Sequence, residues 1–485
     1  MSEMEEDRET CQSIPKRRRV AESEEIGNAT TASTTGDNNG SSSLDYLALH
    51  RSFDDGAALP FAWVQRPLYQ SPAPKQQQCA NNGLSLSSPL LDPHLLSSCR
   101  QGIQSLSRQL LEVKRRLQPA AEACAKAVLE ADGPAHNTNF HQEWHTTASL
   151  EFQEARSVCN PFELLGRKNG LNRRYINRSA IKLANLDALM DFRLIQPTAP
   201  GDPFVFVDLC GAPGGFSEYV MDRCRQYRVH SCHGYGMSLM GTNEHGHGLP
   251  WKLSDQASKV DGTTILYTVC KGYDGTGDIY KWTNVESLRA IIGERSRSMA
   301  HLVVADGGFD AQRENEDQEA LSQKLIVCET VAALACLRQG GTFVLKMFGC
   351  QTSTIRYMMM EINKVFNHLY LFKPISSRPA SAERYLVATG FRGMPPSWDP
   401  QAWRDSIFLG QGLGHDVPPP EEDLHFAYML DLFDHEMLNL NLTACFSILS
   451  YMETKQRGIE TNQALLSYGE KFEIPIERYR RAWRL

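Results

Sequence analysis

A glycine-rich turn is the first candidate for a binding site. Residues 208–216 read DLCGAPGGF. They join a buried strand predicted at 204–209 to a following helix. Small residues let the backbone approach a ligand closely, and open α/β sheets bind nucleosides at such turns. The turn lacks the Lys-Ser/Thr pair of phosphate-gripping loops and the G-x-G-x-x-G spacing of dinucleotide enzymes. It therefore favours neither a nucleoside triphosphatase nor a dinucleotide enzyme.

Two charged residues lie where further buried strands are predicted to end. Asp306 follows the apolar run 301–305, and Lys346 ends the run 341–346. Binding groups normally lie at the carboxyl ends of parallel strands, and a charged side chain beside a buried strand needs a reason to be there. We expect both residues to be functional.

The turn resembles the cofactor loop of the FtsJ-like family of RNA 2′-O-methyltransferases. Three more segments follow in the order of that family: 177–185 (NRSAIKLAN), 305–309 (ADGGF) and 343–348 (FVLKMF). A fourth segment, 372–385 (FKPISSRPASAERY), is most like the branch of the family that acts on capped mRNA. The likeness extends over about residues 150 to 392 and implies transfer of a methyl group to the ribose 2′-hydroxyl of the first transcribed nucleotide.

The resemblance implies that Lys182, Asp306, Lys346 and Glu383 form the catalytic tetrad of the family. The enzyme must align a sulfonium methyl group with a ribose hydroxyl and remove one proton. We assign Lys346 as the base, Lys182 and Asp306 as groups that orient the lysine and the hydroxyl, and Glu383 as the holder of the cations.

The base assignment raises a question of protonation. A free lysine has a pKa near 10.4, so neutralising it at pH 7 costs about 4 to 5 kcal/mol. Burial and the second cation of Lys182 would lower the pKa of Lys346, whereas Asp306 and Glu383 would raise it. The sequence leaves the balance open.

Two of the four residues also have an ordinary explanation. Lys182 could be a solvated side chain of a basic helix, and Glu383 could pair with Arg378 or Arg384.

The cofactor implied by the resemblance is S-adenosyl-L-methionine, with no metal. The residues carried over for it are Asn177, Cys210, Gly211, Ala212, Pro213, Gly214, Gly215, Phe216, Asp278 and Ile279. Asp278 has the short acceptor side chain that an adenine amino group needs. We predict no metal site at the closely spaced potential zinc ligands Cys224, His230, Cys232 and His233. Residues of a strand alternate between its two faces, so four ligands this close together seldom converge.

The implied substrate is capped mRNA or pre-mRNA, and the transcription machinery is a further implied partner. The positions that match RNA-contacting residues of relatives are Arg156, Glu316, Asp317, Gln318 and Ser381. A basic stretch suited to phosphates consists of Arg167, Lys168, Arg173, Arg174 and Arg178, although each could instead be a solvated surface charge.

The elements that must position these residues alternate between strand and helix from about residue 200. This order predicts an α/β fold: a Rossmann-like class I methyltransferase with a seven-stranded, mostly parallel sheet. The expected strands near 369–372 and 384–389 are separated by a loop too short for a crossover helix, so they should pair as an antiparallel terminal hairpin.

We expect four regions along the chain. Residues 1–45 are polar and should be disordered, with a basic nuclear signal at 15–20. Residues 46–139 should be loosely ordered and partly helical, with a helix at about 97–130 that Pro119 breaks or kinks. The methyltransferase domain should occupy 140–395, and a linker and helical region 396–485.

The composition limits the class of protein. The chain of 485 residues is 41% hydrophobic and 22% charged, with a formal net charge of -7, which is unusual for a protein that binds nucleic acid over its whole surface. No apolar run is long enough to span a membrane. The 13 cysteines include no C-x-x-C pair, which favours reduced thiols in the nucleus or cytosol.

Two other functions remain open at this stage. An FtsJ-like methyltransferase of ribosomal or transfer RNA would share the loop and the tetrad, but should lack the 377–383 segment and the helical tail. A catalytically silent RNA-binding scaffold would not require Lys182, Asp306 and Lys346 together.

Overall fold

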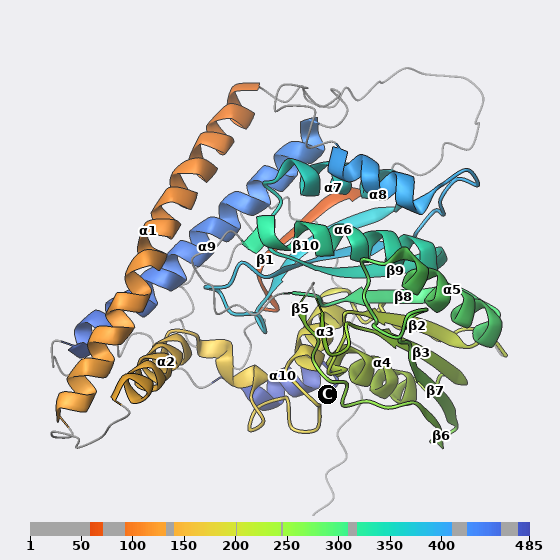
Figure 1. The fold of residues 1–485 in the computed structure, drawn as a ribbon, viewed down its shortest axis with the longest axis horizontal. Helices are drawn as coiled ribbons and strands as arrows, with labels where there is room; N and C mark the ends of the chain where they lie inside the picture. The colour runs from red at the N-terminus through yellow and green to blue at the C-terminus, as the bar shows by residue number, and fades with distance from the viewer. Residues whose placement is uncertain are drawn as a thin grey trace, which may run out of the picture. The chain divides into compact units, whose positions relative to one another are not determined.

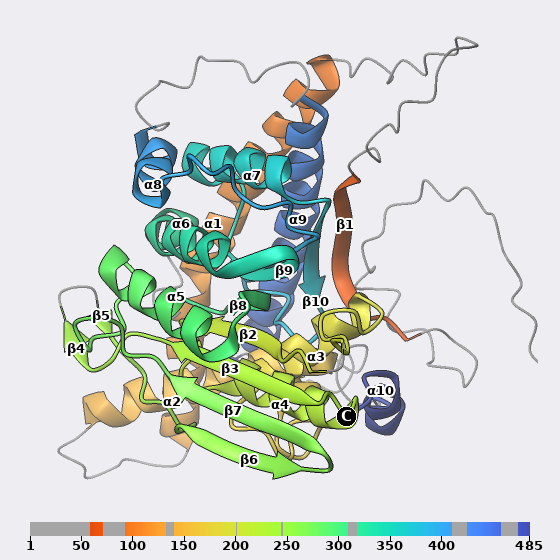
Figure 2. The ribbon, with the colours of Figure 1, turned by 90° about the vertical axis from the view of Figure 1, so that its right-hand side faces the viewer.

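The computed structural model describes residues 59–70, 93–131, 140–199, 201–243, 246–308, 318–409, 424–456 and 474–485. Within them, a nine-stranded sheet has the order β1-β10-β11-β9-β8-β2-β3-β7-β6 (Figure 2). The strands are β1 (Ala62–Gln70), β2 (Phe204–Leu209), β3 (Ser231–Met237), β6 (Gln256–Val260), β7 (Thr263–Val269), β8 (Ala300–Ala305), β9 (Leu337–Met347), β10 (His368–Pro374) and β11 (Arg384–Thr389). A separate two-stranded pair consists of β4 (Thr242–Asn243) and β5 (Gly246–His247).

The sheet is mixed, and the prediction of seven strands was two short. Strands β9, β8, β2, β3 and β7 run parallel to their neighbours in this group, and β10 and β11 form the expected antiparallel hairpin. The two extra strands, β1 and β6, pair antiparallel at opposite edges of the sheet. Neither strand has the continuous apolar run that marked the central strands. β6 is mostly exposed, and β1 lies in a region that was expected to be only partly helical.

Helices cover both faces of the sheet (Figure 1). On one face lie α3 (Ser179–Leu189) and α4 (Gly215–Gln226); on the other lie α5 (Trp282–Ser296), α6 (Gln318–Cys336), α7 (Ser353–Val365) and α8 (Pro400–Leu409). A 3₁₀ helix (Pro161–Gly166) precedes α3, and α10 (Ile476–Ala482) lies near the end of the chain. All six residues of β2 are buried, as expected of a central strand covered on both faces.

Three further helices form a second hydrophobic core. α1 (Pro93–Ala131) lies along α9 (Leu424–Gln456), and α2 (Phe140–Val158) packs beside both (Figure 1). Leu117 and Ala121 of α1 pack with Leu442 and Leu449 of α9 in this core.

The expected break at Pro119 does not occur, since α1 continues through it. Pro119 is exposed, and so is Arg115, the residue whose carbonyl group loses its helical hydrogen bond. Buried Leu117 and Ala120 on either side hold this part of the helix against the second core.

Candidate active site

The sheet brings three of the predicted catalytic residues to one edge. Asp306 follows β8 and Lys346 lies near the end of β9, and these strands are parallel neighbours. β11 is antiparallel to β9, with Tyr385 opposite Lys346, so Glu383 just before β11 reaches the same edge. The fourth residue, Lys182, comes from α3.

Two lysine–carboxylate pairs form at this edge. Lys182 Nζ lies 2.7 Å from Glu383 Oε2, and Lys346 Nζ lies 3.3 Å from Asp306 Oδ1. Lys346 Nζ also donates to the Asp306 carbonyl oxygen at 2.7 Å. All four side chains are 11–13% exposed, so these are nearly buried charges that solvent screens little. Glu383 thus pairs with Lys182 and not with a neighbouring arginine.

The protonation of Lys346 follows from its surroundings. Burial alone would lower the pKa of this lysine, but the carboxylates of Asp306 and Glu383 outweigh burial and raise the pKa above its ordinary value. Burial would likewise raise the pKa of Glu383, but Lys182, Lys346 and Lys373 hold it well below its ordinary value. Without ligands, the site therefore contains a protonated Lys346 and an ionised Glu383.

A crevice of about 210 Å³ opens over these residues. It is lined by Lys182, Lys346 and Glu383 together with three predicted RNA contacts, Arg156, Gln318 and Ser381. The other two, Glu316 and Asp317, lie outside the described residues. Lys114 and Leu117 of α1, Phe152 of α2, and Cys445 and Ile448 of α9 complete one wall, so the helices of the second core border the site.

The glycine-rich turn packs tightly against Asn177. A Cβ added at Gly215 would lie 1.9 Å from Asn177 Oδ1, which also accepts a hydrogen bond from Ser179 N at 3.1 Å. Gly214 has φ +114°, a conformation that L side chains rarely adopt, and starts α4. A Cβ at Gly211 would lie 2.2 Å from Asp208 Oδ1. Glycine is therefore required at these positions, because any side chain there would clash with neighbouring residues of the chain.

The remaining turn residues differ in their exposure. Cys210, Ala212 and Pro213 are partly exposed, whereas the ring of Phe216 is 1% exposed and packs in the core near Tyr385. The Phe216 side chain is therefore a core residue, and only its backbone lies at the turn.

Asp278 and Ile279 lie in the loop after β7, which is tied to the neighbouring strand ends. Met240 N donates to Thr276 O at 2.8 Å, and Cys210 N donates to Met237 O at 2.7 Å. The loops after β2, β3 and β7 thus meet at one edge of the sheet. Asp278 is 3% exposed, and its Oδ1 accepts from Tyr280 N at 2.9 Å.

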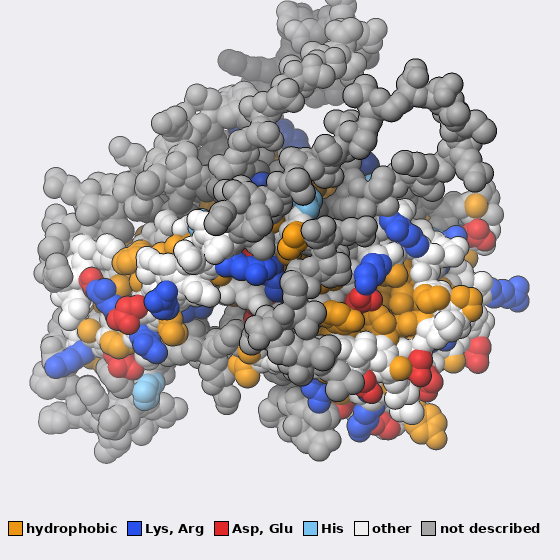
Figure 3. All heavy atoms as spheres, turned by 90° about the horizontal axis from the view of Figure 1, so that it is seen from above, with side chains coloured by type: hydrophobic (Ala, Val, Ile, Leu, Met, Phe, Trp, Pro, Cys, Tyr) orange, Lys and Arg blue, Asp and Glu red, His pale blue; other side chains and the backbone are white. Residues whose placement is uncertain are grey.

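The basic stretch is largely engaged within the chain. Arg167 donates to Ser157 Oγ, Lys168 to Tyr175 O, Arg174 pairs with Asp222, and Arg178 pairs with Glu163. Arg178 also lines the crevice, and Arg173 is exposed. On the face drawn in Figure 3, basic and acidic side chains are mixed at the left-hand end.

Comparison with known proteins identifies the part of the chain that carries the site. The family model of FtsJ-like methyltransferases matches residues 175–391. We call residues 175–391 the FtsJ-like domain, after the family model that they match. All four residues of the predicted tetrad and all the predicted cofactor residues fall within this domain.

Curated relatives match a somewhat longer segment than the FtsJ-like domain. Cap-specific mRNA (nucleoside-2'-O-)-methyltransferase 1 of Mus musculus is 35% identical over 253 residues, which are 50% of this chain and 28% of the relative. The protein of the same name in Drosophila melanogaster is 32% identical over 285 residues, 57% of this chain and 33% of the relative. The matched part thus spans a third or less of the length of these relatives.

A solved structure also aligns with part of this chain. It is a putative ribosomal RNA methyltransferase of Plasmodium falciparum, 19% identical, with a TM-score of 0.31; the alignment covers 45% of this chain and all of that one.

Three residues near the tetrad escaped the sequence analysis. Tyr385 donates to Asp306 Oδ1 at 3.0 Å, Glu329 accepts from Gly307 N at 3.1 Å, and Lys373 is buried behind the 375–383 loop. Burial raises the pKa of Glu329 to about 8. Tyr385 follows Glu383 by two residues in the 372–385 segment. Its position in a strand so close to a site residue was the signal that could have identified it. Glu329 and Lys373 could be identified only from the three-dimensional structure.

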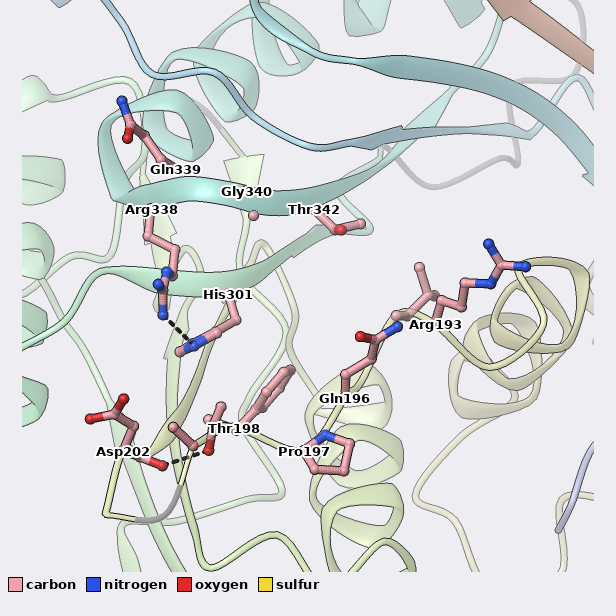
Figure 4. A pocket seen from close by; sticks show the side chains of 14 residues that line it. Arg193, Gln196, Pro197, Thr198, Asp202, His301, Arg338, Gln339, Gly340 and Thr342 are labelled. Atoms are coloured by element: carbon pink, nitrogen blue, oxygen red, sulfur yellow. Dashed lines mark hydrogen bonds between the residues drawn. The ribbon is translucent and has the colours of Figure 1, made fainter. Parts of the chain in front are cut away.

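The FtsJ-like domain has a second, larger cavity at the opposite edge of the sheet. It has a volume of about 380 Å³ and includes Arg193, His301, Arg338 and Gln339 (Figure 4). These residues lie near the amino ends of β8 and β9 and contact none of the tetrad. The site at the carboxyl ends is therefore distinct from this cavity.

Neither metal ligands nor membrane spans are found in the part of the chain that the structure describes. No group of three or more His, Cys, Asp or Glu side chains there could hold a metal ion. His233, one of the possible zinc ligands, instead hydrogen bonds to Ser296 Oγ at 2.8 Å. No described helix is both long and apolar enough to cross a bilayer.

Proposed function

We propose that this chain transfers a methyl group from S-adenosyl-L-methionine to the ribose 2′-hydroxyl of the first transcribed nucleotide of capped mRNA. One observation carries the proposal: Lys182, Lys346 and Glu383 line the same crevice as Arg156, Gln318 and Ser381. Groups suited to proton removal and groups suited to RNA contact thus meet at one place. The FtsJ-like domain and the capped-mRNA enzymes among the relatives support the choice of reaction and substrate.

The glycine-rich edge fits the cofactor. A nucleoside carrying an amino-acid tail needs close backbone approach and a few fixed polar groups. The turn at 210–215, Asn177 beside it, and Asp278 and Ile279 on the neighbouring loop would supply these. Gly308 keeps space next to the base, because a Cβ there would lie 3.0 Å from Lys346 Nζ. When bound, the cofactor supplies an activated methyl group on a positively charged sulfonium.

Lys346 takes the proton of the ribose hydroxyl in this proposal. As the oxygen–methyl bond forms and the sulfur–methyl bond breaks, the hydroxyl proton passes to Lys346 Nζ, which must be neutral beforehand. Asp306 and Glu383 oppose that neutral form. A positive charge placed beside Nζ favours it, so we expect the pKa of Lys346 to be lower in the loaded site than in the empty one.

The other tetrad residues position the base and the hydroxyl. Asp306 holds Lys346 Nζ through its carboxylate and its carbonyl oxygen, and Tyr385 fixes the carboxylate. Glu383 holds Lys182, whose ammonium can donate to the ribose oxygen and stabilise the charge that develops on it.

The substrate contacts and the compartment belong to the same proposal. Arg156 and Arg178 are the crevice residues suited to RNA phosphates, while Gln318 and Ser381 can form hydrogen bonds with the cap or the first nucleotide. We place the protein in the nucleus, where pre-mRNA and the transcription machinery would be its partners. The basic segment 15–20 supports this location but lies outside the described residues.

Labelled methyl transfer to four RNAs of one sequence tests the proposal. They are capped RNA, uncapped RNA, capped RNA with a 2′-deoxy first nucleotide, and capped RNA with a 2′-deoxy second nucleotide as the matched control. We expect label only in the first and the fourth, at the first nucleotide after nuclease digestion. Equal labelling of capped and uncapped RNA, or label at an internal site, would exclude the cap-specific reaction in favour of another RNA substrate.

A further inference from the structure

The loop 375–383 carries two residues of the site, Ser381 and Glu383, and links β10 to β11. Its carbonyl groups are held from below by Lys373 of β10. Lys373 Nζ lies 2.7 Å from Ser381 O, 2.6 Å from Glu383 O and 3.0 Å from Ser377 Oγ. Lys373 is completely buried, so these contacts replace all of its hydration.

Helix α9 holds the same loop from the other side. Asn441 Nδ2 donates to Pro379 O at 2.5 Å and to Ser381 O at 3.0 Å. A carboxamide group has two N–H bonds, so both are used on this loop. Asn441 is 2% exposed, and an unpaired carbonyl at this depth would be costly.

A second contact of α9 lies next to Glu383. Arg384 pairs with Asp434 of α9, and the two side chains are 2% and 0% exposed. Asp434 and Asn441 are seven residues apart, so they share one face of the helix. Cys445 and Ile448 continue this face along the crevice. One side of α9 thus contacts the loop and then borders the site.

Strand β1 adds a contact from the N-terminal part of the chain. Trp63 Nε1 donates to Ser377 O at 3.1 Å, and Trp63 is completely buried. Both β1 and α9 lie outside residues 175–391, which match the family model. Segments beyond the FtsJ-like domain therefore fix the loop that carries its glutamate.

We propose that Asn441 of α9 is a positioning residue for methyl transfer: by holding Pro379 and Ser381, it sets the place of Glu383 and of Lys182 paired with it. This inference rests on the proposed function. Asn441 is absent from the lining of the crevice, so its loss should slow turnover without weakening cofactor binding. A shift of about 1 Å in a positioned group can reduce the rate of a reaction about 100-fold.

Two leucine variants on α9 test this role. Asn441→Leu keeps the size of the side chain but removes both donors, and Asn439→Leu is the matched control, since Asn439 is exposed on the same helix. We expect kcat on capped RNA to fall about 10- to 100-fold in Asn441→Leu. The dissociation constant of S-adenosylhomocysteine should stay within about threefold of the parent value. Asn439→Leu should be unchanged.

Hydrogen–deuterium exchange separates this inference from the proposed function. Amides of 376–383 should exchange faster in Asn441→Leu than in the parent, and this readout needs no activity. If the parent protein methylates no capped RNA, the proposed function fails. The exchange result still decides whether Asn441 holds the 375–383 loop in place. Unchanged exchange together with kcat within about twofold of the parent would overturn the inference. If Asn441→Leu does not fold, Asn441→Ser, which is too short to reach both carbonyls, is judged by the same criteria.

Discussion

Lys346 Nζ donates to the carbonyl oxygen of Asp306 at 2.7 Å and lies 3.3 Å from the carboxylate of the same residue. One residue at the end of β8 therefore both orients the amine and stabilises its charged form. The lysine is well placed to take a proton, but it must first lose one. This requirement makes the rate of transfer sensitive to pH.

The pH dependence of single-turnover methyl transfer should reveal this requirement. Since the surrounding carboxylates raise the pKa of Lys346, the neutral amine is the minor form at pH 7. The rate should therefore rise about tenfold per pH unit from pH 6 until it approaches the pKa of Lys346 in the loaded site. A rate that stays constant between pH 6 and 9 would contradict a step that needs the neutral amine.

Glu383→Gln should reduce kcat by about 10- to 100-fold, because a neutral amide holds the Lys182 ammonium less firmly than a carboxylate does. Binding of S-adenosylhomocysteine, measured by calorimetry, should change little. The control is Glu361→Gln, which removes a partly exposed carboxylate that pairs with Lys364 on α7. If both variants retain the parent kcat, Glu383 has no part in turnover.

Tyr385→Phe should lower kcat by about tenfold and leave folding intact. The phenyl ring keeps the buried packing, while the Asp306 carboxylate loses the hydroxyl that lies at 3.0 Å. Tyr370→Phe on β10 provides the matched control in steady-state assays. An unaltered kcat in Tyr385→Phe would show that the Lys346 contact alone holds Asp306.

Glu329→Gln should stabilise the fold at alkaline pH. Burial raises the pKa of Glu329 to about 8, so the folded protein binds one more proton than the unfolded chain between about pH 4.5 and 8. This group therefore makes the free energy of unfolding fall with rising pH across that window, and a neutral amide removes the dependence. Urea unfolding should show the parent losing about 2 to 3 kcal/mol relative to the variant between pH 6 and pH 8.5. Parallel profiles for variant and parent would contradict a protonated Glu329.

The central strands and the site residues followed from the sequence because their signals are local. β2 and β11 have the expected bounds, since each is a short apolar run flanked by turns. Asp306 and Lys346 were found at strand ends, and the rule that parallel strands share a carboxyl edge placed them together.

Local sequence signals could not identify the edge strands of the sheet or the residues that hold the 375–383 loop. β1 pairs with β10 across some 300 residues of chain, and its central Arg66 and Pro67 conceal its strand character. Asn441 lies in a long, largely apolar helix, and only the packing of α9 on the 375–383 loop gives it a distinctive environment. The balance between burial and the charges of Asp306 and Glu383 that sets the pKa of Lys346 likewise depends on the packing of the whole site.

Single-turnover transfer to capped RNA by Lys346→Met is the most direct test of the catalytic role of Lys346. The variant keeps the apolar stem of the side chain and removes the amine. Its control is Lys364→Met, which changes an exposed side chain of α7. We predict a rate about 10²- to 10⁴-fold below that of the parent, with S-adenosylhomocysteine bound as tightly as before. A rate within tenfold of the parent value would contradict proton removal by Lys346.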